Sequence, residues 1–384
     1  MAEKISYVVK DKIGIIKEGD CSILESNYIE KYKKTTKEIH KKNEWKSMGS
    51  GAKFMNQISY VESEKAPRAT INGIDFIKEA EVIYSVSVDN LSGILKKNIE
   101  TGEESYIIHG SETNFYNLDY NAQINRAIVA TQETYLERHI AILNIDNSYY
   151  QVITEGDTIE DNPVWSNRES SVLYYDSAGV GKDYEGKIMG FGPKVINKLN
   201  IDTGELEEVI GDAYYDCFLP KLDEEDNIYF LKKPYKEMNK HINPLKIFLI
   251  PFKILKAIYM WLNIFSMRYN GEPLNSNGNN PSKTKQVDEK EIIINGNLIN
   301  AQKVFKENQS KGEKYPGIAP RSWQLVKMNK EGEFTIIKKG VLDFDVDKDG
   351  NIIYSNGKYI IKIDKSGQEE IIHKEELVTK IKSN

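Results

Sequence analysis

The sequence predicts an all-β fold, a six-bladed β-propeller with two helical insertions. Short β-rich cores recur along its 384 residues, and the intervals from Val82 to Ala127 and from Ala127 to Val172 are both 45 residues. A second marker follows each core: a strand, a short turn of Asn, Asp or Gly, and another strand, as in residues 196–209. A repeat of about 40 to 45 residues with four strands has the spacing of a propeller blade.

Six such cores define the blades, and each is expected to be the second strand of its blade. They are residues 13–16, 82–84, 127–129, 172–174, 228–230 and 352–354. The composition agrees, because tyrosine, which occurs 23 times, and β-branched residues favour pleated, half-buried surfaces. One small sheet cannot bury both of its faces, whereas radially packed sheets cover one another. We therefore expect one propeller over residues 1–375.

The repeats also predict where the blades begin and end. The blades run from about Lys4 to Ala66, then to Gly110, Gly156 and Gly211, then from Asp212 to Gly340 and from Val341 to His373. The first blade carries an insertion at Asn27 to Gly51, which we place between its third and fourth strands. The fifth carries a larger insertion at residues 235–320. Residues 5–17 should begin the first blade beside the C-terminal blade.

The composition restricts partners and location. The formal net charge is −6, whereas a nucleic-acid-binding protein usually presents a strongly basic face, so we expect no nucleic-acid partner. The two cysteines, Cys21 and Cys217, form no Cys/His cluster, which is typical of a reducing compartment. The charged N-terminal residues interrupt any apolar core of signal-peptide length. These features favour a cytoplasmic protein without a cofactor.

One run in the sixth blade is similar to the start of a calcium-binding loop. It consists of Asp345, Asp347, Asp349 and Gly350. A calcium loop of this kind needs a bidentate Glu at its twelfth position, and Asn356 stands there. Because strands flank the run, we interpret it as a blade turn, with a metal site as the alternative.

No catalytic residue is assigned from the sequence. There is no GxSxG motif, and the glycines around Lys182 lack the spacing of a phosphate-binding loop, so we expect a flexible loop there. His109, His139 and His373 lie at predicted blade edges without a paired carboxylate at a recognisable spacing. We expect these histidines to be structural.

The insertion in the fifth blade contains an unusual segment at residues 241–269. It has four cationic residues, Lys or Arg, and no acidic residue, with a wide face of aromatic and aliphatic side chains. The pattern predicts an amphipathic helix from about Pro251 to Met267, suited to lie in an anionic membrane surface. The alternatives are packing against a partner protein or against the propeller itself. A hairpin is expected after it, at residues 291–301.

The predicted membrane-contact residues are three lysines and seven large apolar or aromatic residues. They are Lys246, Phe248, Phe252, Lys253, Leu255, Lys256, Tyr259, Trp261, Leu262 and Phe265. The first insertion predicts a basic helix, with seven lysines and three glutamates between Asn27 and Lys46. That helix is either simply solvated or makes an electrostatic contact with a membrane or a protein.

The fourth blade resembles a known repeat. Pro163, Trp165 and Ser166, followed by the strand VLYYDS, are close to the P-x-W-S motif, polar turn and strand of TolB-type six-bladed β-propellers. They are also similar to the WD-repeat-like blades of prolyl-oligopeptidase-like proteins. The resemblance implies the fold and no activity, because one fold supports many functions.

The leading functional hypothesis is a non-catalytic scaffold or sensor. It would lie peripherally at the inner face of the cytoplasmic membrane and use one propeller face to bind a protein or a small ligand. The alternative is a lyase or hydrolase with its site at the central channel. That enzyme would need His, Glu or Asp side chains from several blades to converge at one mouth of the channel.

Overall fold

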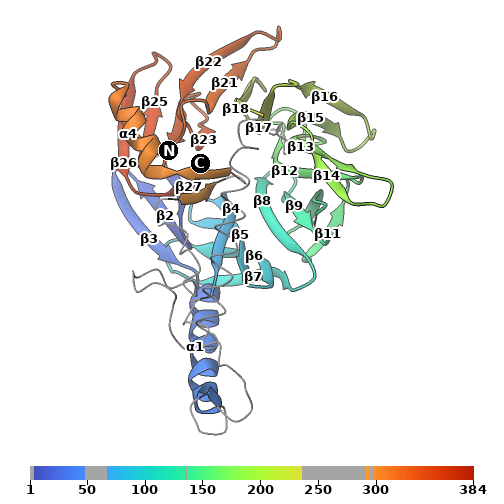
Figure 1. Ribbon diagram of the computed structural model, residues 1–384, viewed down its shortest axis with the longest axis vertical. Helices are drawn as coiled ribbons and strands as arrows, with labels where there is room; N and C mark the ends of the chain where they lie inside the picture. Colours follow the sequence, from blue (N-terminus) through green and yellow to red (C-terminus); the bar gives the residue numbers. More distant parts are fainter. Residues whose placement is uncertain (1–3, 48–66, 135, 236–290, 295–296) are drawn as a thin grey trace, which may run out of the picture. The chain divides into compact units, whose positions relative to one another are not determined.

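The computed structural model describes residues 4–47, 67–134, 136–235, 291–294 and 297–384 (Figure 1). The chain divides into two compact units, one made of Met1–Tyr235 with Val304–Asn384 and one made of Lys236–Lys303. The first unit contains six antiparallel sheets arranged as the blades of a propeller. The predicted all-β six-bladed fold with two helices is therefore confirmed.

The chain passes through the blades in sequence order, starting at the innermost strand of each except the first. Blades 2 and 3 consist of β4 (Ala69–Lys78), β5 (Glu81–Val88), β6 (Leu91–Asn98) and β7 (Glu104–Gly110), then β8 (Asn114–Asn121), β9 (Arg126–Gln132), β10 (His139–Asn144) and β11 (Tyr149–Val152). Blade 4 consists of β12 (Thr158–Trp165), β13 (Val172–Lys182), β14 (Ile188–Phe191), β15 (Val195–Asn200) and β16 (Leu206–Ile210).

The last two blades follow the same order. Blade 5 consists of β17 (Tyr215–Leu222), β18 (Ile228–Pro234), β21 (Gln324–Met328) and β22 (Phe334–Lys339), and blade 6 of β23 (Asp343–Val346), β24 (Ile352–Ser355), β25 (Tyr359–Ile363) and β26 (Glu369–Lys374). Five of the predicted cores fall in β5, β9, β13, β18 and β24, the second strands of five separate sheets, as expected.

Blade 1 is assembled from both ends of the chain. Its strands lie in the order β27 (Val378–Ser383), β1 (Lys4–Val9), β2 (Lys12–Lys17) and β3 (Asp20–Glu25). The C-terminal strand is thus the innermost strand of the first blade, which confirms that residues 5–17 lie beside the C-terminal part of the chain. It also shows that core 13–16, expected to be a second strand, is the third, and that the ring includes residues beyond 375.

Apolar side chains fill the space between neighbouring blades. Val8 and Ile13 of blade 1 pack with Ile71 and Val82 of blade 2, and similar clusters join the other blades. The inner strands, such as β1 and β5, therefore bury residues on both faces of their sheets, which explains the continuous apolar cores in the sequence, whereas the outermost strands are largely exposed. Burial of this apolar surface is the main favourable contribution to folding.

Helix α1 (Asn27–Ser47) is anchored at the rim between blades 1 and 2 (Figure 1). The N–H groups of Asn27 and Tyr28 donate to the carboxylate of Glu104 at 3.1 and 2.8 Å, and Lys97 pairs with the same carboxylate at 3.1 Å. A carboxylate at a helix N-terminus accepts the free N–H groups and interacts favourably with the helix dipole. The helix follows β3, the outermost strand of blade 1, so its expected place inside the blade was wrong.

The large insertion lies between β18 and β21, the second and third strands of blade 5. In the second unit β19 (Glu291–Ile294) pairs with β20 (Asn297–Asn300), which confirms the predicted hairpin. Helix α4 (Ala301–Ser310) follows, and its buried Asn308 donates to the carbonyl groups of Gly317 and Ala319. The predicted helix at 251–267 lies outside the described residues.

No helix within the described part of the chain is long and apolar enough to cross a membrane.

A close contact between Tyr7 and Gly14 lies within blade 1, the blade that both ends of the chain form. The ring of Tyr7 on β1 lies across Gly14 on β2, and a Cβ atom at Gly14 would lie 2.0 Å from the Tyr7 Cζ atom. Tyr7 is fully buried, and its hydroxyl group lies 3.1 Å from the Cys21 sulfur on β3. The absence of a side chain at Gly14 is therefore what allows the tyrosine to cross the middle strand of its own blade.

We predict that Gly14→Ala lowers the free energy of unfolding by about 1 to 3 kcal/mol, because the new methyl group must displace a packed ring. Thermal and urea unfolding followed by circular dichroism measure the change. Gly110→Ala is the matched control, since no heavy atom lies within 4 Å of a Cβ atom at that strand end. Equal stability of the two variants would contradict the role assigned to the Tyr7 contact.

Candidate functional site

A cavity of about 350 Å³ lies at one mouth of the central channel, and charged residues of five blades line it. They are Asp75, Asp119, Lys221, Asp345 and Lys382, from β4, β8, β17, β23 and β27. Each occupies the same position in its innermost strand, and the residue two places earlier lines a narrower cavity of about 30 Å³. This follows from the alternation of side chains along a strand.

The carboxylates at this position join neighbouring blades. In each case a backbone N–H group of the next blade donates to the Oδ2 atom of an aspartate. The bonds run from Tyr120 to Asp75 at 2.8 Å, from Trp165 to Asp119 at 2.9 Å and from Ser383 to Asp345 at 2.8 Å. The acceptor oxygens belong to buried side chains, so these bonds fix the inner strands relative to one another, and the bond to the ionised Asp119 is of the strong, charge-assisted kind.

Blade 4 has Val164 at this position, and a residue of its second strand provides the carboxylate. Asp176 on β13 is fully buried, and its Oδ2 atom accepts the N–H group of Leu219 in blade 5 at 2.9 Å. Its Oδ1 atom pairs with Lys194 at 2.5 Å. Leu219 has a φ of +57°, a conformation that is costly for an ordinary residue and that persists where surrounding bonds hold it.

Two lysines neutralise the carboxylates at the mouth. The Nζ atom of Lys382 lies 2.6 Å from Oδ1 of Asp119 and 3.3 Å from Oδ2 of Asp75, and its side chain is 17% exposed. Lys221 lies 3.8 Å from Asp345. Because charges interact strongly where water is scarce, each aspartate depends on its lysine for the stability of its charged form.

The shared lysine leaves the two aspartates with different pKa values. Burial raises the pKa of Asp75 to about 7, and the nearby Asp119 carboxylate adds to this effect. Burial also acts to raise the pKa of Asp119, but the charges of Lys382 and Lys221 outweigh it and hold that pKa below its usual value. Asp75 therefore carries the proton of the pair near neutral pH.

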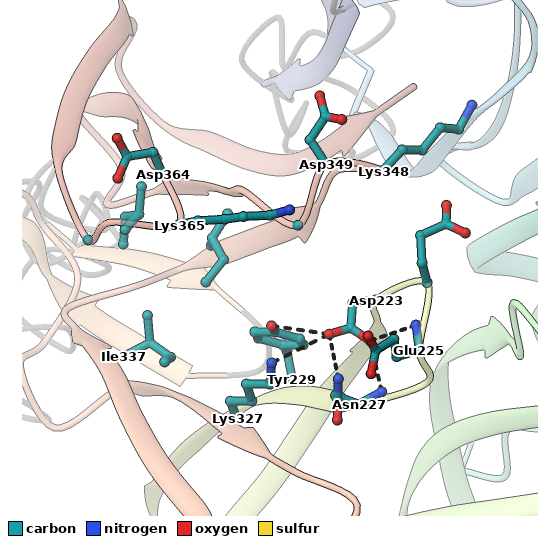
Figure 2. Close-up of a pocket in the computed structure, with 15 residues that line it drawn as sticks. Asp223, Glu225, Asn227, Tyr229, Lys327, Ile337, Lys348, Asp349, Asp364 and Lys365 are labelled. Atoms are coloured by element: carbon teal, nitrogen blue, oxygen red, sulfur yellow. Dashed lines mark hydrogen bonds and ion pairs between the residues drawn. The ribbon is translucent and has the colours of Figure 1, made fainter.

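A second cavity, of about 530 Å³, lies between blades 5 and 6 (Figure 2). On its blade 5 side, Asp223 accepts bonds from Asn227 and lies 3.5 Å from the ammonium group of Lys327. On its blade 6 side, the side chain of Lys365 runs along the blade toward the turn that carries Lys348 and Asp349 (Figure 2). The two cavities share Glu224 and Lys348 in their linings, so they open on the same side of the propeller.

The aspartate run of blade 6 is a turn, as predicted. Asp347 accepts the N–H group and the side-chain amide of Asn351, both at 2.7 Å, and Gly350 has a φ of +74°. Asp345 faces the channel and Asp349 lines the second cavity, so the carboxylates point to different places. Within the described residues no group of three or more His, Cys, Asp or Glu side chains could hold a metal ion.

The three histidines lie apart from one another. The ring of His109 lies tilted against that of Tyr106 with ring centroids 4.9 Å apart, and His373 lies beside Cys21. The Nδ1 atom of His139 lies 3.9 Å from a carboxylate oxygen of Glu160, a pairing that no sequence spacing indicated. None of the three reaches the channel mouth.

Two other predictions concern residues away from the channel. The glycine-rich stretch before Lys182 is not a loop, because β13 continues to this lysine and pairs with β14. Lys182 forms ion pairs with Glu137 and Asp157 that hold it at the rim. The ten predicted membrane-contact residues, between Lys246 and Phe265, lie outside the described residues.

Solved structures share the fold of this chain. No protein-family model and no curated protein sequence matches the chain. A chain of a nidogen–laminin complex is 9% identical at a TM-score of 0.50, with 99% of this chain and 98% of that chain covered. TolB from Acinetobacter baumannii is 9% identical at a TM-score of 0.51, with 99% and 66% covered. At these identities the likeness concerns the fold alone, and it supports a TolB-type propeller.

We predict that the stability of the wild-type protein falls relative to that of Asp75→Asn as the pH rises from about 4 to 7. The unfolded chain releases the proton of Asp75 near pH 3.8, whereas the folded protein keeps it up to about pH 7. The protonated Asp75 therefore makes its full contribution to the free energy of unfolding below pH 3.8, and this contribution is lost as the pH rises to about 7. Chemical unfolding at several pH values should show a relative change of about 2 kcal/mol or more.

Asp161→Asn is the control for this pH experiment. Burial acts to raise the pKa of Asp161, but the charges of Arg138, Lys194 and Lys380 outweigh it and lower the value to about 2. The charged Asp161 therefore stabilises the folded state above pH 3.8, and this stabilisation is lost only as the pH falls toward 2. The free energy of unfolding of the Asp161→Asn variant, plotted against pH, should consequently run parallel to that of the wild type from pH 5 to 8. Parallel curves for Asp75→Asn as well would refute the protonated Asp75.

Proposed function

We propose that the protein is a non-catalytic propeller scaffold or sensor. It binds a protein or a small ligand on the side where the channel cavity and the cavity between blades 5 and 6 open. Segment 241–269 holds it at the cytoplasmic surface of an anionic membrane. The first part is supported by the geometry of the channel, and the second by the sequence of the segment.

The observation that carries the proposal is that every carboxylate oxygen of the three mouth aspartates has a partner. Each Oδ2 atom accepts an N–H group of the next blade, and each Oδ1 atom has a further partner. The Oδ1 atom of Asp75 accepts the backbone N–H group of Phe76 at 2.7 Å, that of Asp119 accepts the ammonium group of Lys382, and that of Asp345 lies near the ammonium group of Lys221. A lyase or hydrolase would instead need a carboxylate that can reach a substrate proton. Aspartates that are fully engaged in joining blades support a structural role for these groups.

The two cavities, at the channel mouth and between blades 5 and 6, provide surfaces that can bind a ligand. Volumes of about 350 and 530 Å³ lie within the usual range of ligand pockets, which is roughly 300 to 1,000 Å³. In the part of the chain that the structure describes, no carboxylate pairs with Lys348 or Lys365. Their ammonium groups are therefore available to an acidic group on a ligand, and Glu224 and Asp349 to a basic one.

We expect a photo-crosslinking amino acid at Gln123 or Lys348, both exposed at the channel mouth, to trap the partner in intact cells. The same group at Glu207, which is exposed on the outer strand β16, is the matched control and should trap nothing at comparable yield. Mass spectrometry of the adducts identifies the partner. Adducts that form equally well from Glu207 would show that the mouth is not the binding surface.

For the membrane part of the proposal, we predict that the intact protein floats with anionic liposomes at low salt. Apolar side chains and headgroup attraction should add, the latter at about 1 kcal/mol for each lysine or arginine near the surface. Replacing Phe252, Leu255 and Leu262 with Ser should abolish flotation without changing the thermal unfolding of the propeller. Replacing Lys246, Lys253 and Lys256 with Gln should weaken it and reduce its salt dependence.

The deletion of residues 241–269 is the reference for no binding. Wild-type protein that stays in the soluble fraction with anionic vesicles at low salt would reject the membrane contact. In that case the segment serves as a partner or packing surface, and the proposed ligand site at the channel mouth is unaffected.

A further inference from the structure

A cluster of three reactive side chains lies where blade 6 meets blade 1. Cys21 on the outermost strand of blade 1 is exposed, and its sulfur lies 3.6 Å from the Nε2 atom of His373 on the outermost strand of blade 6. The hydroxyl group of Tyr7 lies 3.1 Å from the same sulfur. The rings of Tyr7 and His373 are 5.8 Å apart, so both flank the thiol.

Each of the two neighbours has a distinct chemical role toward the sulfur. With the proton of the neutral imidazole on Nδ1, the Nε2 atom of His373 is a base that can accept the thiol proton. Burial raises the pKa of Tyr7, so its hydroxyl group stays protonated and can donate to a thiolate. A nucleophile beside a base, with the base or its product held by a third group, is the usual arrangement of an activated thiol.

The place of Tyr7 in this cluster is built into the blade. Its ring crosses Gly14 on β2, where the absence of a side chain lets the hydroxyl group reach Cys21 on β3. The three residues come from positions 7, 21 and 373 of the sequence, and ring closure brings them together. An exposed thiol that merely sat on a strand would need no such arrangement.

We propose that Cys21 is a site of oxidation by hydrogen peroxide, with His373 as the base and Tyr7 as the donor that holds the thiolate. The sulfur attacks one peroxide oxygen, so an S–O bond forms and the O–O bond breaks. The thiol proton passes to His373 and then to the leaving hydroxide, which departs as water. The products are a cysteine sulfenic acid and water, and the sulfur is oxidised as the peroxide is reduced.

A small oxidant of this kind suits the site. Hydrogen peroxide is neutral and small, and it can hydrogen-bond to both flanking groups, whereas its leaving hydroxide needs a proton that the imidazolium ion supplies. The other cysteine of the chain offers a natural contrast. Cys217 is 1% exposed, and burial raises the pKa of its thiol to about 12, so it should not react.

The test uses the full-length reduced protein, hydrogen peroxide as the oxidant and dimedone as the trap for sulfenic acid. Peptide mass spectrometry should locate the adduct on Cys21 and not on Cys217. Its rate of formation should be at least tenfold faster than that of glutathione sulfenic acid under the same conditions. Adducts at equal rates on both cysteines, or a Cys21 rate equal to that of glutathione, would overturn the proposal.

Substitutions then separate activation from exposure. His373→Gln keeps a polar group of similar reach but removes the base, and it should slow labelling of Cys21 at least tenfold. Tyr7→Phe should slow it several-fold, while Cys217→Ser, the matched control, should leave the rate unchanged. Thermal unfolding shows whether each variant is folded. A folded His373→Gln variant that reacts as fast as the wild type would refute the role of the histidine.

Discussion

The hydrogen bond from a backbone N–H group to the aspartate of the preceding blade is the constraint on which the inner ring depends. Apolar contacts hold the blades together, but they are not directional and do not set the position of one innermost strand against the next. The carboxylates of Asp75, Asp119 and Asp345 do, because each accepts an N–H group from the adjacent sheet. Where blade 4 lacks this residue, Asp176 on the neighbouring strand makes the equivalent bond.

Placing these carboxylates in a narrow channel imposes a second requirement, which is charge balance. Lys382 and Lys221 supply it in part, while burial and the nearby Asp119 carboxylate keep the pKa of Asp75 raised to about 7. Buried pairs of this kind are sensitive to the loss of one partner, because the remaining charge is left without compensation. The mouth of the channel therefore combines buried carboxylates that already have partners with exposed residues such as Gln123 and Lys348.

The fold was largely predictable from the sequence because each blade repeats a local pattern. The apolar cores and the Asn, Asp and Gly turns identify second and later strands within one stretch of chain. Strand β27 was not predicted from the sequence, because Lys380 and Lys382 face the channel and the strand therefore has no apolar run. The channel positions of Asp75 and Asp119 were missed for a similar reason, and Asp345 was noticed only as part of a turn. An acidic residue within a strand reads as solvent-exposed, and its actual partners come from other blades, such as Lys382 for Asp119.

The pairing of β27 with β1 also determines how the protein must fold. Ser6 and the carbonyl group that it bonds, on Lys382, are separated by 376 positions. Contacts between such distant residues form slowly, because a long loop must close before they are made. During synthesis on the ribosome, β1 therefore waits with an unpaired edge while the other five blades emerge, and an open edge can pair with other chains. Chaperone demand in the cell should depend on the time until residue 382 leaves the exit tunnel.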